Sequence, residues 1–92
     1  MGLKSLRIAG RMLRPLPGLK TPDSFQEGVR QLVRPYIPIT EQDYKKLLAM
    51  PCDYYRLKDD RVVTFGSADG GFALMPLHPM AAQQVLRFAY QP

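Results

Sequence analysis

Nine prolines divide this chain of 92 residues into short pieces, and they limit the length of every helix or strand. Proline lacks the backbone N–H donor and disfavours a helical conformation of the residue before it. Pro15, Pro35 and Pro51 therefore each predict the end of a helix, and the three prolines and one glycine of residues 15–22 predict a linker. The chain must build its fold from short elements.

Between the prolines, the hydrophobic period predicts a mixture of helices and strands. Capping boxes at Ser24 and Thr40 predict helices over 24–34 and 41–49. A helical period returns over 79–90, and alternation with turn residues predicts strands over 54–58, 61–66 and 72–76. We therefore expect an α+β fold for a small single domain, residues 23–92, in which a three-stranded antiparallel β-sheet packs with three to four short helices.

The first two of these strands predict a hairpin around residues 59–60. A two-residue turn would place Lys58 opposite Arg61, and like charges that face each other destabilise a strand pair. A four-residue loop avoids this pairing and sets Leu57 opposite Val62. We expect that register.

The net charge of +5 is carried by the N-terminal segment. Residues 1–22 hold five bases and no acid, whereas residues 23–92 hold eight bases and eight acids. We predict that segment 1–14 forms a basic amphipathic helix, because four of its bases fall within an arc of about 80° and leucines lie beside them. The residues expected to bind a partner are Lys4, Arg7, Arg11, Arg14, Leu3, Leu6 and Leu13.

A basic segment of this kind fits several partners. It can contact nucleic-acid phosphates, lie in an acidic groove of a protein or rest on an anionic membrane. Its Arg-rich, acid-free composition also resembles an import peptide. It can equally dock on its own domain with its bases solvated, or form a homodimer through its leucines.

Aromatic and basic residues are interleaved in the hairpin region and predict a second candidate interface. In proteins that bind single-stranded nucleic acid, aromatic rings stack on bases while cations follow the backbone. The candidates are Tyr54, Arg56, Lys58, Arg61 and Phe65. Core packing is the competing interpretation, since tyrosine and phenylalanine are ordinary strand residues.

The sequence contains no convincing catalytic or metal site. Cys52 and His78 are the only cysteine and histidine, and no third group stands at a spacing that would orient them as nucleophile and base. One cysteine and one histidine cannot supply four zinc ligands. Residues 67–71 lack the lysine of a phosphate-binding loop, and Asp59 and Asp60 lack the spacing of a calcium loop. We therefore expect a protein that is not an enzyme and needs no cofactor or metal.

Length and composition restrict the class further. The length allows one domain, and a single cysteine excludes an internal disulfide and fits a reducing compartment. No apolar run approaches the roughly 20 residues of a membrane span. Arginine, proline, glycine and alanine are common and asparagine is absent, which matches G/C-rich codons of a bacterium or its phage. We predict the cytoplasm of a bacterial host cell as the location.

These observations predict a small non-enzymatic protein-binding factor encoded by a phage or mobile element. It would act as an inhibitor or assembly subunit of a larger complex, through a basic surface that meets an acidic surface of the partner. The alternative is a nucleic-acid-binding module that contacts phosphates through its N-terminal arginines and bases through the hairpin aromatics.

Overall fold

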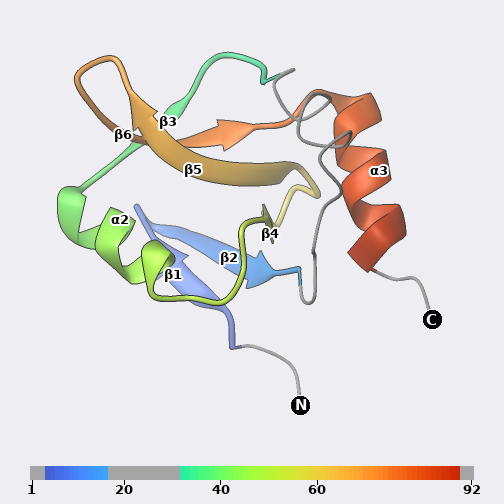
Figure 1. The fold of residues 1–92 in the computed structure, drawn as a ribbon, viewed down its shortest axis with the longest axis horizontal. Helices are drawn as coiled ribbons and strands as arrows, with labels where there is room; N and C mark the ends of the chain where they lie inside the picture. Colours follow the sequence, from blue (N-terminus) through green and yellow to red (C-terminus); the bar gives the residue numbers. More distant parts are fainter. Residues whose placement is uncertain (1–3, 17–31, 90–92) are drawn as a thin grey trace.

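In the part of the chain that the structure describes, the fold is a six-stranded antiparallel sheet with two helices. The structure is a computed structural model that describes residues 4–16 and 32–89. The sheet has the strand order β1-β2-β4-β5-β6-β3 (Figure 1). Its elements along the chain are β1 Leu6–Ile8, β2 Arg11–Pro15, β3 Ile37–Ile39, α2 Glu41–Leu48, β4 Tyr55–Arg56, β5 Val62–Ala68, β6 Gly71–Pro76 and α3 Pro79–Ala89.

The predicted three-stranded sheet with three to four helices is therefore wrong. The sheet contains three further strands, because β1 and β2 add to it beside β4 and because β3 pairs with β6. Of the predicted helices, those over 41–49 and 79–90 coincide closely with α2 and α3. The helix predicted over 24–34 lies mostly outside the described residues, and within its described end Leu32 forms an antiparallel bridge to Leu77.

The predicted N-terminal helix is also wrong, since these residues form the β1–β2 hairpin. Ala9 and Gly10 form its two-residue turn with φ angles of 52° and 75°. Positive φ at both positions defines the type I′ turn, whose twist matches that of paired strands. The register pairs Leu6 with Leu13 and Ile8 with Arg11. In this conformation Ile8 and Leu13 lie on the same side of the sheet, and both are fully buried.

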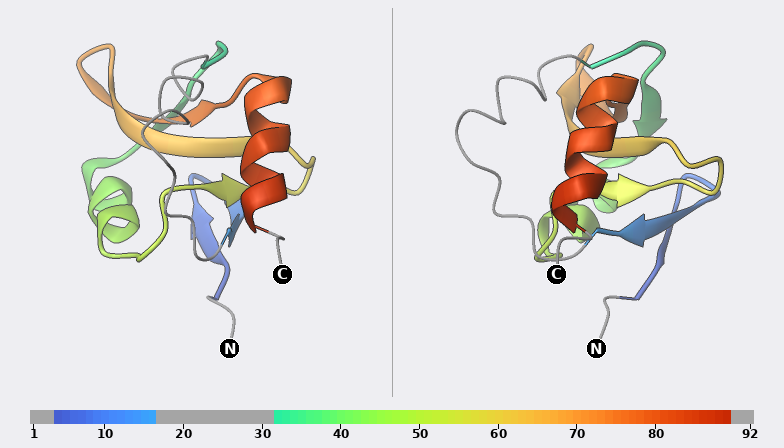
Figure 2. Two further views of the ribbon diagram at one scale, coloured as in Figure 1. Left: turned by 45° about the vertical axis from the view of Figure 1, so that its right-hand side comes forward. Right: turned by 90° about the vertical axis from the view of Figure 1, so that its right-hand side faces the viewer.

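The sheet curls around an inner core on one of its faces. This inner core contains side chains from β1, β2, β5, β6 and α2 together with Cys52, Tyr55 and Leu57, so the two ends of the sheet approach each other across it. Tyr55, with no exposed surface, is the largest completely buried side chain among the described residues. Figure 2 shows β1 and β2 on one side of the molecule and β5 and β6 on the other.

A second, outer core lies on the opposite face of the sheet, beneath α3. Ala81 and Val85 of this helix pack with Leu16, Tyr54 and Val62. The division between the cores follows the alternation of a strand, since Tyr54 and Val62 belong to the outer core whereas Tyr55 and Val63 belong to the inner one. The two helices lie at opposite sides of the molecule (Figures 1 and 2).

The β4–β5 hairpin forms in the predicted place but in a different register. Val62 pairs with Arg56, not with Leu57. The loop contains an odd number of residues, because the Leu57 N–H donates to the Arg61 carbonyl at 2.8 Å and the Asp60 N–H to the Leu57 carbonyl at 2.9 Å. Asp60 adopts a φ of 72°, which places it in the left-handed region expected in a three-residue hairpin loop. A shift of one residue exchanges the two faces of a strand, so Arg56 shares a face with Val62.

Candidate binding surface

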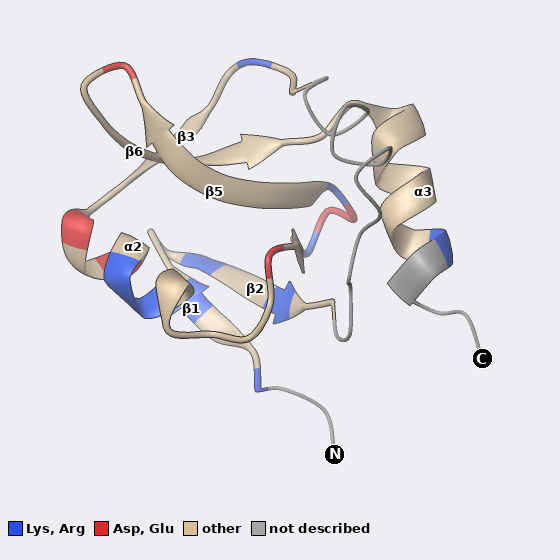
Figure 3. Cartoon of the chain, viewed as in Figure 1, with Lys and Arg blue, Asp and Glu red and all other residues tan. Residues whose placement is uncertain are grey.

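Arg7 of β1, Arg14 of β2 and Arg56 of β4 gather on the part of the outer sheet face that continues beyond the outer core. Arg7 pairs with Met12 in the register, and Arg14 pairs with Arg56, so alternation directs these four side chains to the same side. Lys58 and Asp60, in the β4–β5 loop, border them. We call this set the basic face: Arg7, Met12, Arg14, Arg56, Lys58 and Asp60. Figure 3 shows basic residues recurring along β1 and β2.

The Asp60 carboxylate forms ion pairs with two of the arginines, Arg14 and Arg56. Asp60 Oδ1 lies 3.5 Å from Arg14 Nη2 and 3.4 Å from Arg56 Nε. Arg14 also donates to the Leu57 carbonyl at 3.4 Å. Arg56 is the more enclosed of the two, with 26% of its side chain exposed, and its Nε is buried without a hydrogen-bond partner in the described structure. The shared Asp60 leaves the pair of arginines with a net positive charge.

The other cations of the basic face have less compensation. Within the part of the chain that the structure describes, no carboxylate lies within ion-pair distance of Arg7 or Lys58. Nearby Asp59 is engaged elsewhere, since Arg61 donates to it from its backbone N–H and, at 2.8 Å, from Nε. The Arg61 backbone N–H, its side chain and Arg11 together lower the pKa of the Asp59 carboxyl. The basic face therefore attracts anions.

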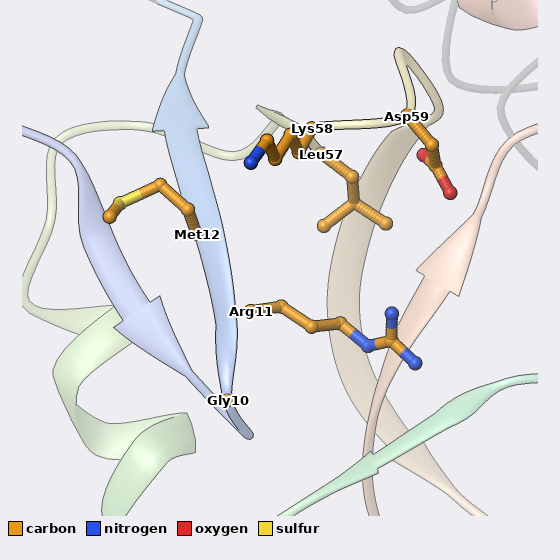
Figure 4. A pocket seen from close by; sticks show the side chains of 6 residues that line it. All are labelled: Gly10, Arg11, Met12, Leu57, Lys58 and Asp59. Atoms are coloured by element: carbon orange, nitrogen blue, oxygen red, sulfur yellow. The ribbon is translucent and has the colours of Figure 1, made fainter.

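The basic face is hollowed where β2 and β4 separate. Their pairing ends at Arg14 and Arg56, and a hollow of about 630 Å³ lies beyond it on the basic face. An adjoining hollow of about 390 Å³ shares Gly10, Met12 and Lys58 with it and is also lined by Arg11, Leu57 and Asp59. Figure 4 shows Met12 and Arg11 leaving opposite sides of β2. Met12 is 42% exposed, which puts an apolar, flexible side chain among the cations. The hollows can therefore accept a group that is partly apolar and partly acidic.

The structure separates the residues that the sequence placed in one partner-binding stripe. Arg7 and Arg14 lie on the basic face, whereas Arg11 lies across the sheet from them. Leu13 is fully buried and therefore stabilises the fold instead of facing a partner, while Leu6 is partly buried against the inner core. Lys4 is exposed just before β1, and Leu3 lies outside the described residues.

The residues proposed for nucleic-acid stacking are divided in the same way. Tyr54 is 5% exposed beneath α3, and Phe65 packs against the inner core with its ring 5.9 Å from that of Tyr44. Tyr54 therefore offers no open face to a base, and the partly buried Phe65 lies on the opposite side of the sheet from the basic face. Arg56 and Lys58 contribute to the basic face instead, and Arg61 pairs with Asp59. Sequence reasoning missed Met12 and the pairing of Arg14 with Arg56. The only local signal was the alternation of residues 6–8, because residues 11–14 place two apolar residues side by side.

The candidate catalytic residues have structural roles. Cys52 is buried, and its single S–H lies within hydrogen-bond distance of two carbonyls, those of Tyr54 at 2.9 Å and Leu16 at 3.3 Å. Burial raises the pKa of this thiol, which keeps it protonated and unreactive. His78 accepts a hydrogen bond from the Met80 N–H through Nδ1 at the start of α3.

The glycine-containing segment 67–71 contains a turn between two strands. Asp69 and Gly70 have φ angles of 54° and 80° and form the β5–β6 turn. Among residues 4–16 and 32–89, no group of three or more potential ligands is placed to hold a metal ion. None of the helices in these ranges has the length and apolar character needed to cross a membrane.

Comparison with protein families, with curated proteins and with solved structures finds no match to this chain.

Proposed function

We propose that this protein is a non-enzymatic binding factor that recognises an acidic segment of a partner protein through the basic face. It would act as an inhibitor or an assembly subunit by occupying a surface of a larger complex. The observation that carries the proposal is the arrangement of Arg7 and Lys58, which line one hollow with exposed Met12 between the cations.

The mixture of charge and apolar surface favours a protein partner over a nucleic acid. Phosphate contacts need cations alone, whereas an exposed methionine among the cations suits the aliphatic part of a glutamate or a neighbouring apolar side chain. Binding to a single strand also relies on open aromatic rings. Among the described residues, Tyr54 and Tyr55, which precede Arg56 in the chain, are buried in the two cores.

The experiment compares a peptide with DNA as probes. A fluorescein-labelled peptide of about ten residues, rich in glutamate and valine, and labelled single-stranded and duplex DNA are titrated with protein across a salt series. We expect the peptide to bind more tightly than either DNA. A tighter complex with DNA, whose affinity falls linearly on a log–log plot against salt, would instead support the nucleic-acid-binding module.

Charge reversal then locates the surface. Arg7→Glu and Lys58→Glu are each expected to weaken peptide binding by about 5- to 30-fold, from loss of one attractive contact and gain of a repulsive one. Lys46→Glu is the matched control, because Lys46 is exposed on α2, which packs against the other face of the sheet. Equal weakening by all three variants would show that only net charge matters and would refute the proposed surface.

A further inference from the structure

The backbone of β1 offers a second kind of contact at the margin of the basic face. β1 is the last strand at one end of the sheet, and one of its two edges pairs with β2. Among the described residues, none pairs with its other edge. A strand edge of this kind presents unpaired N–H and C=O groups on which a further extended segment can be added.

The register identifies which backbone groups point outward. In a two-residue hairpin the residues that flank the turn form the hydrogen-bonded pair, here Ile8 and Arg11. Hydrogen-bonded and non-hydrogen-bonded pairs alternate in an antiparallel ladder, so Arg7 and Met12 form the next, non-hydrogen-bonded pair. The N–H and C=O of Arg7 therefore point away from β2 and toward the open edge.

We propose that the acidic partner segment binds as an added β-strand along the outer edge of β1, with its main chain hydrogen-bonded to Arg7. This inference rests on the proposed function and specifies the conformation and pattern of the ligand. Side chains of an added strand alternate between the faces of the sheet. Those on the side of Arg7 meet the basic face, and those on the other side lie next to Leu6 and Ile8 of the inner core. The ligand is thus an extended segment in which acidic and apolar residues alternate.

Charge also selects an acidic segment over a second copy of this chain. An antiparallel pair of two β1 edges centred on Arg7 would set the Arg7 side chains of both copies opposite each other, and like charges across a strand pair are unfavourable. Basic residues on an edge strand discourage self-association in general. The same residues attract an acidic strand.

A proline substitution tests the backbone contact apart from the charge. Arg7→Pro removes the outward N–H but no hydrogen bond of the β1–β2 ladder, and Leu6 already has the extended conformation that precedes a proline. Arg7→Gln removes the same positive charge and keeps the N–H. With a labelled peptide of alternating glutamate and valine, we expect Arg7→Pro to bind about 3- to 10-fold more weakly than Arg7→Gln. Equal affinities would overturn the added strand.

Two further measurements keep the outcomes distinct. Circular dichroism checks that Arg7→Pro folds, and hydrogen exchange of the Arg7 amide in the wild-type protein gives an answer that does not depend on this variant. Peptide binding should slow that exchange at least 10-fold, while an unchanged rate in the complex would overturn the proposal. If the wild-type protein does not bind the acidic peptide at all, the proposed function itself fails. If it binds, but equally well to a peptide whose glutamates and valines form two separate blocks, only the added strand fails.

Discussion

Substitutions in the β1–β2 turn test the hairpin directly, because a hairpin and a helix predict effects of opposite sign. Gly10 has a φ of 75° and adopts the left-handed region that L-residues disfavour. A Cβ atom added at this position would have no neighbouring heavy atom within 4 Å. The effect of Gly10→Ala therefore measures backbone conformation and not a steric clash.

The magnitude follows from the backbone alone. Placing alanine in the left-handed region costs about 1–2 kcal/mol, so Gly10→Ala should lower the free energy of unfolding by that amount. For a domain of this size, such a loss lowers Tm by roughly 4–8 °C per kcal/mol. In a helix the same substitution would raise the free energy of unfolding by about 1 kcal/mol. The two structures differ by about 2–3 kcal/mol in their predictions.

Ala9→Asn supplies the complementary test. Ala9 already occupies the left-handed region with a φ of 52°, and asparagine tolerates this region better than alanine does. Asn-Gly is also a preferred sequence for the type I′ turn. We expect Ala9→Asn to raise the free energy of unfolding by about 0.5–1 kcal/mol, whereas in a helix asparagine would be worse than alanine by a similar amount.

Urea denaturation of the wild-type protein and both variants, followed by circular dichroism and tyrosine fluorescence, provides the assay. The denaturation midpoint should shift while the slope m stays constant, which identifies a change in stability rather than in the unfolded state. Stabilisation by Gly10→Ala together with destabilisation by Ala9→Asn would refute the hairpin.

Two other predictions concern the cores. Leu13→Ala should lower the free energy of unfolding by about 2–5 kcal/mol because Leu13 is completely buried, while Met12→Ala next to it should cost under about 1 kcal/mol; equal effects in urea denaturation would contradict the assigned faces. The Cys52 thiol should resist a thiol reagent in the native state, since burial raises its pKa above the ordinary 9.0. Its contribution to stability is complete below that ordinary value and is lost as pH rises through the raised pKa, so the stability difference between wild type and Cys52→Ala should shrink in alkaline solution. A difference independent of pH would argue against a buried, protonated thiol.

The elements that sequence predicts well are those with strong local signals. The Thr40 capping box is present as expected, with the Asp43 N–H donating to Thr40 Oγ1 at 3.1 Å, and it begins α2 one residue later. The strands β5 and β6 are recognisable from alternation and from the turn residues between them. Their positions needed no knowledge of distant residues.

The N-terminal segment has a pattern that fits two periods. Leu6 and Leu13 lie on one side of a helix, and in a hairpin they are directly opposite each other. Ala9 is a strong helix former, which favours the wrong alternative, and it is not among the residues typical of a type I′ turn. Pairing of β2 with β4, about 40 residues further along the chain, favours the hairpin, and no local propensity records that contact.

The candidate site depends on the same long-range contact. The sequence alone determined that the positive charge is concentrated near the N-terminus, that the elements are short and that a β-hairpin forms around residues 59–60. Only the tertiary structure decided that Arg7 and Arg14 share a face with Arg56, that Leu13 is core and that Tyr54 is covered. The physical reason is that charge and local period are properties of neighbouring residues, whereas the face of each strand depends on register, and a shift of one residue reverses it.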